Sequence, residues 1–400
     1  MSEPGAKAGR SKLGVVALAF VAFVALGMPD GLLGVAWPSI RASFALPLDA
    51  VGLLLVATVA GYLTSSALSG PLVARWGVGQ VLAVSCALTG AGMLGYTLVP
   101  TWWLVVVLGV VAGLGAGAID AGLNTYAAAH FGESLMQWLH ASYGVGVTLG
   151  PVIMTLALTD RQSWQLGYRV VGLFQLGLAV CFVLTRPIWN RSDPPAGGPS
   201  ARRLTDYQTS LRETLRQPRV WLSVLLFFLY TGSEGTLGTW AYSLLTGSRG
   251  IRPAVAGFWA GSYWATFTVG RILAGLFAHR LGGHGLVRGS LVGALFGAIL
   301  LAWNPAPAAN LVAVALIGLA IAPIFPALTS GTSRRVGVRF AANTIGLQMS
   351  AAGLGIAVIP SLVGVAARQI SLEVVPLCLA GIFLSLLGLQ VLARRAAPTA

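Results

Sequence analysis

Long apolar runs, separated by short polar segments, dominate the chain. A helix that crosses a membrane needs about 20 mainly apolar residues, and twelve runs meet that length. They form two groups of six, divided by one long polar stretch at 187–218. The approximate runs are 13–40, 49–74, 79–99, 101–129, 136–159 and 165–186, followed by 219–246, 254–279, 285–303, 308–333, 339–366 and 371–393.

This pattern predicts an all-α membrane protein with twelve transmembrane helices in two six-helix bundles. The expected parts are a cytoplasmic tail at 1–12, a first bundle at 13–186, a cytoplasmic central loop at 187–218 and a second bundle at 219–394. Inside the central loop, Leu204, Tyr207, Leu211 and Leu215 recur at helical spacing among arginines. That spacing suits a short amphipathic helix on the inner membrane surface, and a plain solvated linker suits it equally.

The composition excludes most soluble classes of protein. Charged residues make up 9% of the chain and hydrophobic residues 56%, whereas a soluble domain carries about 25% charged residues. The three cysteines lie within apolar runs, and there are only four histidines. We therefore expect no disulfide scaffold, no metal site, no cofactor and no nucleic-acid partner.

The net charge of +14 comes from lysines and arginines at the ends of the predicted helices. If the N-terminus is cytoplasmic, the inner loops and tails carry three times as many of these residues as the outer loops. Such a bias sets the orientation of membrane proteins. It predicts that both termini are cytoplasmic.

The two halves of the chain are similar to each other at an offset of about 204–209 residues. The matching pairs include Asp30 with Glu234, segment 70–77 with 275–282, and segment 113–124 with 318–329. Gly144, Gly146 and Pro151 also match Gly353, Gly355 and Pro360. An even number of helices in each half keeps the same orientation, so the repeats are parallel.

Parallel six-helix repeats are the arrangement of the major facilitator superfamily, which the chain resembles over nearly its full length. Gly70, Arg75 and Gly77 resemble the cytoplasmic motif of that family between helices 2 and 3, although Ala74 replaces the usual acid. Within the superfamily, three segments are similar to the fucose-permease-like sugar:proton symporter group. They are Pro29 to Gly31, Asp120 to Asn124, and Leu139-His140 with Gly144, Gly146 and Pro151.

Four charged residues lie well inside the predicted spans, and they are the main candidates for function. They are Asp30, Asp120, Glu234 and Arg271. Each costs about 2.5–3.5 kcal/mol at the centre of a bilayer on insertion scales, so such residues usually serve a function. The resemblance implies that Asp30 and Asp120 couple transport to protons and bind substrate. The alternative for Asp30 is that it caps or stabilises a helix broken by glycines, and the alternative for Asp120 is a structural ion pair or hydrogen bond.

Neighbours at helical spacing extend this candidate site. Gly27, Asp30, Gly34 and Trp37 share one helix face, Asn124 follows Asp120 by one turn, and Tyr230 precedes Glu234 by one turn. The predicted substrate-binding residues are therefore Asp30, Trp37, Asp120, Asn124, Tyr230 and Glu234. We expect Arg75, Arg271 and Arg280 to act in gating and His140 to serve as a proton relay or a plain hydrogen-bonded histidine. Tyr126, Tyr143, Trp240, Tyr263 and Trp264 are further aromatic candidates, for which packing is the commoner role.

These observations predict a secondary transporter that moves a small hydroxylated, sugar-like solute with protons by alternating access. We expect it to work as a monomer in the cell membrane, the inner membrane if the cell is bacterial, without enzymatic activity. The alternative is a drug:proton antiporter, because Gly146-x-x-x-Gly150-Pro151 resembles an antiporter motif on helix 5. In that motif a further glycine pair follows, and here Met154 and Thr155 stand in its place. A membrane-embedded enzyme or receptor is disfavoured, because no loop carries a nucleophile and base, and sodium in place of protons stays open.

Overall fold

The computed structural model describes residues 4–130, 133–189 and 209–395. Side-chain placement is described for these residues except 4–13, 125, 128–130, 133–134, 136–137, 275–282 and 394–395. All regular elements in the described part are helices, as the apolar runs predict. The described residues form two compact units, one from 1–44 and 56–197 and the other from 45–55 and 198–400.

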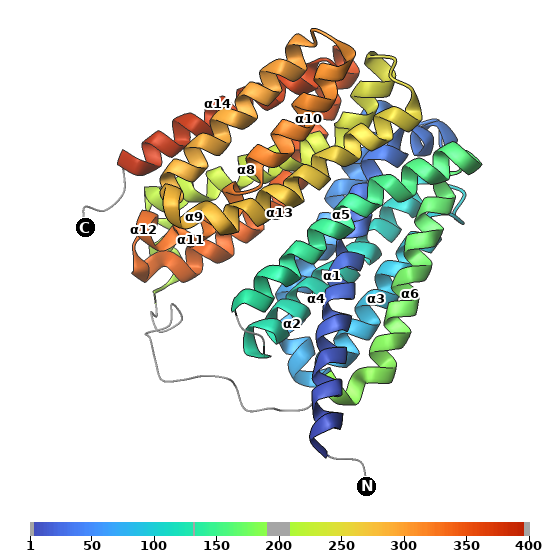
Figure 1. Ribbon diagram of the computed structural model, residues 1–400, viewed down its shortest axis with the longest axis vertical. Helices are drawn as coiled ribbons and strands as arrows, with labels where there is room; N and C mark the ends of the chain where they lie inside the picture. The colour runs from blue at the N-terminus through green and yellow to red at the C-terminus, as the bar shows by residue number, and fades with distance from the viewer. Residues whose placement is uncertain (1–3, 131–132, 190–208, 396–400) are drawn as a thin grey trace. The chain divides into compact units, whose positions relative to one another are not determined.

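The first unit is built from six long helices (Figure 1). Within it α1 packs along α5, and α3 packs along both α4 and α6. The first turn of α2, with the short 3-10 helix Leu48–Ala50 before it, groups with the second unit. The helices are α1 (Pro4–Ser43), α2 (Val51–Trp76), α3 (Val78–Tyr96), α4 (Trp102–His130), α5 (Glu133–Arg161) and α6 (Trp164–Trp189).

The second unit repeats this plan with more interruptions. Here α8 packs along α13, and α9 packs along α10 and α14. A π-helical turn at Leu244–Ser248 extends α8. The helices are α7 (Leu211–Leu215), α8 (Pro218–Ser243), α9 (Pro253–Trp303), α10 (Pro307–Ile321), α11 (Ile324–Ser330), α12 (Thr332–Val336), α13 (Val338–Gln369) and α14 (Val374–Arg395).

Eleven helical segments of the described residues are long and apolar enough to cross a membrane. They correspond to eleven of the twelve predicted spans. The exception is the predicted span 254–279, which forms the first part of α9 and is rich in glycine, tryptophan, tyrosine, serine and threonine. The protein is therefore a multi-span membrane protein.

One predicted boundary is wrong. The break expected between the spans 254–279 and 285–303 is absent, since α9 is assigned as helix from Pro253 to Trp303 and contains no proline after its first residue. The span predicted at 308–333 corresponds to the candidate span Pro307–Ser330, in which the helix is interrupted between α10 and α11. Pro323 lies at this interruption, and a proline cannot donate the backbone hydrogen bond that a helix interior requires.

The expected amphipathic helix of the central loop is short. Leu211–Leu215 forms α7, and the Ser210 side chain caps it by accepting a hydrogen bond from the Glu213 backbone N–H at 3.2 Å. Leu204 and Tyr207 lie outside the described residues. The helix is therefore present at Leu211 and Leu215.

Glycine makes the sharp connection between α2 and α3. Gly77 has a φ of 78°, in the left-handed region that residues with a side chain rarely adopt. Gly337 has a φ of 91° between α12 and α13. The segment of Gly70, Arg75 and Gly77, which resembles the family's cytoplasmic motif, therefore ends in a tight turn at Gly77.

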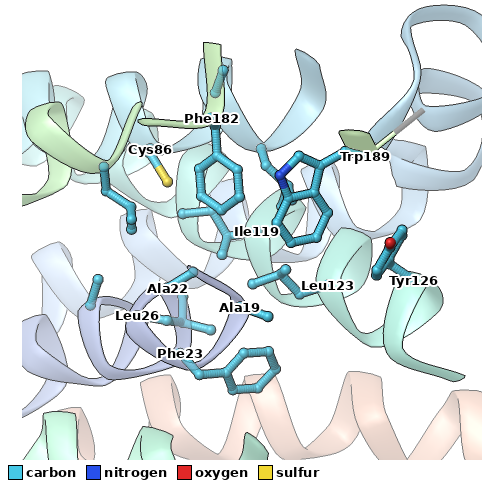
Figure 2. Packing of buried hydrophobic residues seen from close by; sticks show 14 of the residues in the cluster. Ala19, Ala22, Phe23, Leu26, Cys86, Ile119, Leu123, Tyr126, Phe182 and Trp189 are labelled. Carbon is cyan, nitrogen blue, oxygen red and sulfur yellow. The ribbon is translucent and has the colours of Figure 1, made fainter. Parts of the chain in front are cut away.

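An apolar core joins α1, α3, α4 and α6 in the first unit (Figure 2). The Trp189 ring lies 4.8 Å from the Tyr126 ring and 5.3 Å from the Phe182 ring, measured between centroids. Cys86 is fully buried in the same core, as its place in an apolar run predicts. In a membrane, such close packing rather than water exclusion holds helices together.

Glycines set the closest helix contacts, and they do so at matching positions in the two units. A side-chain carbon on Gly146 would collide with the backbone oxygen of Val24, and one on Gly355 would collide with that of Phe228. Gly113 and Gly318 are a second such pair, against the backbone oxygens of Thr58 and Tyr263. The sequence repeat is thus also a repeat of backbone-to-backbone contacts.

One buried cation is fully satisfied at the ends of α8 and α14. The Arg249 side chain is only 3% exposed and donates to Glu373 at 2.7 Å and to the backbone oxygen of Leu301 at 2.7 Å. It also donates to Asn310. The Arg249 hydrogen bond lowers the pKa of the Glu373 carboxyl.

We predict that replacing Gly146 with Ala destabilises the folded protein, because the added methyl group must push α1 away from α5. Overpacking of this kind costs about 1–3 kcal/mol, which should appear as a lower midpoint of thermal unfolding in detergent. Gly177→Ala is the matched control, since its added carbon meets nothing within 4 Å. Equal midpoints for the two variants would contradict the assigned role of Gly146.

A second prediction concerns acid sensitivity. Because the pKa of Glu373 is lowered in the folded state, its ion pair contributes stability above the unfolded value of about 4.3 and loses it as the pH falls through the folded value. Wild-type protein should therefore lose more thermal stability between pH 7 and pH 4 than Glu373→Gln. Glu213→Gln removes an exposed ion pair with Arg339 and should behave like the wild type. If the difference in unfolding midpoint between wild type and Glu373→Gln did not change with pH, the prediction would be refuted.

Candidate functional site

Asp30 lies on α1 and is bound by α5. The Tyr143 hydroxyl donates a hydrogen bond to Asp30 Oδ2 at 2.5 Å. Gly27 and Gly31 make this possible, since a side chain at either position would collide with the α5 backbone, at Tyr143 and Val147. Asp30 itself is exposed, so its carboxylate is open to solvent.

Asp120 lies on α4 and is held by two donors. Tyr62 of α2 donates through its hydroxyl to Asp120 Oδ2, and Asn124 donates through Nδ2 to Oδ1 at 2.8 Å. Gly117, one turn before Asp120, lets α2 approach, because a side chain there would collide with the backbone oxygen of Tyr62. The Asp120 side chain is half-buried.

The two acids belong to one polar network of the first unit. Tyr62 interacts electrostatically with Asp30 as well as with Asp120. His140 on α5 interacts electrostatically with Asp120, and its ring lies edge-on to Phe23 at 5.5 Å. The sequence predicted Asp30, Asp120, Asn124 and His140, and the structure brings all of them together.

Tyr62 is the member of the network that sequence reasoning missed. It lies in an apolar run without any recognisable motif, and nothing in its spacing relates it to Asp120, which is 58 residues away. Tyr62 lies on α2 and Gly117 on α4, and only the folded structure shows that these helices meet at the two residues. Tyr143 was predicted only as a general aromatic candidate, and the structure places its hydroxyl on Asp30.

A second polar cluster lies in the second unit around Glu234. Tyr230 and Arg271 interact electrostatically with the Glu234 side chain, and the Tyr263 hydroxyl donates to its backbone oxygen at 2.9 Å. Arg271 also stacks over the Phe267 ring at 4.5 Å. Its Nε is buried and has no hydrogen-bond partner among the described residues.

This cluster changes the interpretation of Arg271. The sequence assigned Arg271 to gating and Glu234 to substrate, whereas the structure places their charges in one cluster. A cation beside an acid reduces the cost of keeping either one within the membrane. The ring of Phe325 lies 6.2 Å from Tyr230 and forms an apolar neighbour.

Other predicted site residues lie elsewhere. Trp37 is fully buried, with its indole 5.7 Å from that of Trp102, so packing accounts for its position and substrate contact stays a prediction. Arg75 is exposed in the last turn of α2. The side chain of Arg280 lies outside the described part of the chain. The gating role of both arginines also stays a prediction.

The first-unit network can exchange protons and bind hydroxyl groups. Asp30 and Asp120 each accept a hydrogen bond from a tyrosine hydroxyl, a donor that sugar hydroxyls could replace because they have the same chemistry. Within the described part of the chain, no group of three His, Cys, Asp or Glu side chains is placed to hold a metal ion.

Comparison with known proteins identifies the family. Residues 18–360 match the Major Facilitator Superfamily. The chain is 24% identical to sodium-dependent glucose transporter 1 of Homo sapiens, across 86% of this chain and 71% of that protein. It is 21% identical to the glucose/mannose transporter GlcP of Bacillus subtilis (strain 168), across 96% and 95%.

The fold also resembles solved transporters. A crystal structure of a D-xylose-proton symporter superposes with a TM-score of 0.73 at 15% sequence identity, covering 94% of this chain and 97% of the other. At that identity the likeness concerns the fold. Taken with the family match over 18–360, it shows that the chain belongs to the Major Facilitator Superfamily and is a membrane transporter rather than an enzyme.

Proposed function

We propose that the protein transports a small hydroxylated, sugar-like solute together with protons. The observation that carries this proposal is the network in which Asp30 and Asp120, on α1 and α4, are bound by tyrosines of α5 and α2. Relatives whose names state glucose or mannose as substrates support the sugar class. We further propose that both termini are cytoplasmic and that the monomer is the working unit.

The acids supply the coupling step. A carboxylate that accepts a proton loses its charge, which removes the cost of carrying that charge through a closed state. Asp30 is exposed and can take its proton from water, and His140 offers a second exchangeable group beside Asp120. In proteins of this superfamily the site opens alternately to each side, so the proton and the solute can be released together.

The available energy is sufficient with one proton per solute. One charge moving across 100 mV yields about 2.3 kcal/mol. At about 1.4 kcal/mol for each factor of ten, this supports roughly fiftyfold accumulation of a neutral solute. Two acids therefore need not mean two protons, since one of them can serve mainly to bind the solute.

The second unit supplies the groups that would orient the solute. Glu234 and Arg271 offer an acceptor and a cationic donor, which can hydrogen-bond to hydroxyls of a sugar ring. Phe325 adds an aromatic face, on which the apolar face of a sugar can stack. Tyr230 is fully buried beside them, so its contact with the solute stays a prediction.

A drug:proton antiporter stays the alternative, supported by the Gly146-x-x-x-Gly150-Pro151 pattern and by the carboxylates within the predicted spans, which would suit cationic drugs. In the structure both glycines serve the contact of α5 with α1. A side chain on Gly146 would collide with Val24, and one on Gly150 would collide with Met28. Sodium is a remaining alternative for the coupling ion, because one relative is named sodium-dependent.

We predict that Asp30→Asn and Asp120→Asn each abolish proton-driven accumulation of labelled glucose in proteoliposomes. Both variants should retain some counterflow exchange, because exchange needs no net proton movement. Asp160→Asn is the matched control, since Asp160 is an exposed residue in the last turn of α5, and it should accumulate glucose like the wild type.

The imposed gradient separates the proposals. Accumulation driven by a sodium gradient at constant pH would replace the proton with sodium and leave the site intact. Wild-type accumulation in both aspartate variants would exclude the assigned coupling role. Failure of the wild type to exchange any of a panel of hexoses, pentoses and nucleosides would exclude the sugar-like class.

A further prediction concerns Tyr62. Tyr62→Phe removes the hydroxyl that donates to Asp120, and a hydrogen bond to a charged group contributes about 1.5–3 kcal/mol. Uptake should therefore fall at least about tenfold, and its pH profile should shift. Tyr96→Phe, which removes a buried hydroxyl from a ring packed on Tyr168, should leave the pH profile unchanged. An unchanged profile in Tyr62→Phe would show that the hydroxyl has no part in coupling.

A further inference from the structure

A hollow of the second unit lies apart from both polar clusters. Helices α8, α9, α11, α12 and α14 all contribute to it. Its charged and polar side chains are His284, Arg334, Arg335 and Gln390. None of the residues that line it is acidic. The transport site described above explains none of these residues.

Arg335 is the central residue of this hollow. It is only 7% exposed, yet its hydrogen-bond partners are all neutral. Its Nε and Nη2 donate to Ser223 Oγ at 3.3 and 3.2 Å, and Nη2 also donates to Thr332 Oγ1 at 3.1 Å and to the Leu328 backbone oxygen. No hydrogen bond is recorded for Nη1 among the described residues. Gly331 lies against Nη1, because a side-chain carbon there would be 2.8 Å away.

A second guanidinium adds to the charge. Arg334 is exposed, and its Nη2 lies 3.6 Å from where a side-chain carbon of Gly283 would be. Burial and the charge of Arg334 lower the pKa of Arg335 to about 10, so Arg335 remains cationic at neutral pH. A buried cation is normally paired with an anion, because its desolvation is otherwise uncompensated.

Within the described part of the chain, no ion pair joins an acid to Arg334 or Arg335. Glu213 is bound to Arg339 at 2.8 Å and does not line the hollow. Contrast Arg249 in the same unit, which is also buried and is paired with Glu373. Among the described residues, these two arginines therefore differ in what their side chains meet. Arg249 is paired with a carboxylate, whereas Arg335 lines a hollow.

The position of the hollow relative to the candidate membrane spans suits a phosphate group at the membrane surface. Leu226 and Val287 lie inside candidate spans, whereas Arg334 and Arg335 lie between the spans that end at Ser330 and begin at Val338. The lining thus changes from apolar to cationic where a bilayer changes from acyl chains to headgroups. Basic pockets between membrane helices bind anionic headgroups in this way.

We propose that this hollow is a binding site for a phosphate-bearing anion, held by Arg334 and Arg335. An anionic phospholipid headgroup and free inorganic phosphate share the chemistry that would be recognised. Arginine suits both, because its planar array of donors matches two phosphate oxygens at once. The site does not depend on which solute the protein transports.

The test uses the purified full chain, delipidated in a neutral detergent. Binding of dioleoyl phosphatidylglycerol and of inorganic phosphate is titrated by the rise in the unfolding midpoint, with phosphatidylcholine and chloride at equal ionic strength as references. We expect Arg334→Gln to weaken binding about tenfold, as loss of a charge-assisted hydrogen bond implies. Arg288→Gln is the matched control, because Arg288 is exposed on α9 and does not line the hollow, and its affinity should change less than twofold.

A second variant keeps the two arginines and fills the hollow. Ala327→Met places a longer side chain in the lining and should weaken binding as Arg334→Gln does. Binding of phosphatidylglycerol alone would assign the site to lipid, and competition by phosphate would assign it to the free anion. Equal loss in Arg334→Gln and Arg288→Gln, unchanged binding in Ala327→Met, or no stabilisation of the wild type by either ligand would each overturn the proposal.

Discussion

The cost of placing charge inside a bilayer governs this structure. Four ionisable residues lie well within the predicted spans, and each is provided with a partner or with access to water. Tyr143 binds Asp30, Tyr62 and Asn124 bind Asp120, and Arg271 accompanies Glu234. Because hydrocarbon offers no hydrogen bonds, the protein itself must supply these partners, and all of them except Asn124 lie on another helix. The helix contacts that deliver them are therefore as much a part of the site as the acids.

Much of the fold could be predicted, because each span carries its own signal. The length and hydropathy of an apolar run depend only on its own residues. Eleven segments of the described residues are long enough and apolar enough to cross a membrane. The boundary that failed depends on more than composition. The spans predicted at 254–279 and 285–303 are joined within the single helix α9. Hydropathy also gives no sign of the interruption at Pro323, which lies inside one candidate span.

The candidate site could be predicted in part for the same reason. Asp30, Asp120 and Glu234 are conspicuous because a charge in an apolar run is costly. Tyr62 carries no such signal, since tyrosine is tolerated in membrane helices and its importance comes from a helix 58 residues away. Trp37 was chosen for sharing a face with Asp30, and it packs on Trp102 instead. Helical periodicity groups residues on one helix and gives no information about which neighbour they meet.

The glycine contacts explain how two halves of one chain can diverge so far and stay alike. At Gly146 with Val24, and at Gly355 with Phe228, the surface met by the missing side chain is a main-chain oxygen. Every amino acid has that oxygen, so the opposite position can hold valine in one unit and phenylalanine in the other without altering the fit. The packing of the helices therefore depends on a few positions that lack a side chain. The other positions can differ between the halves, as Asp120 in one half and Phe325 at the equivalent place in the other show.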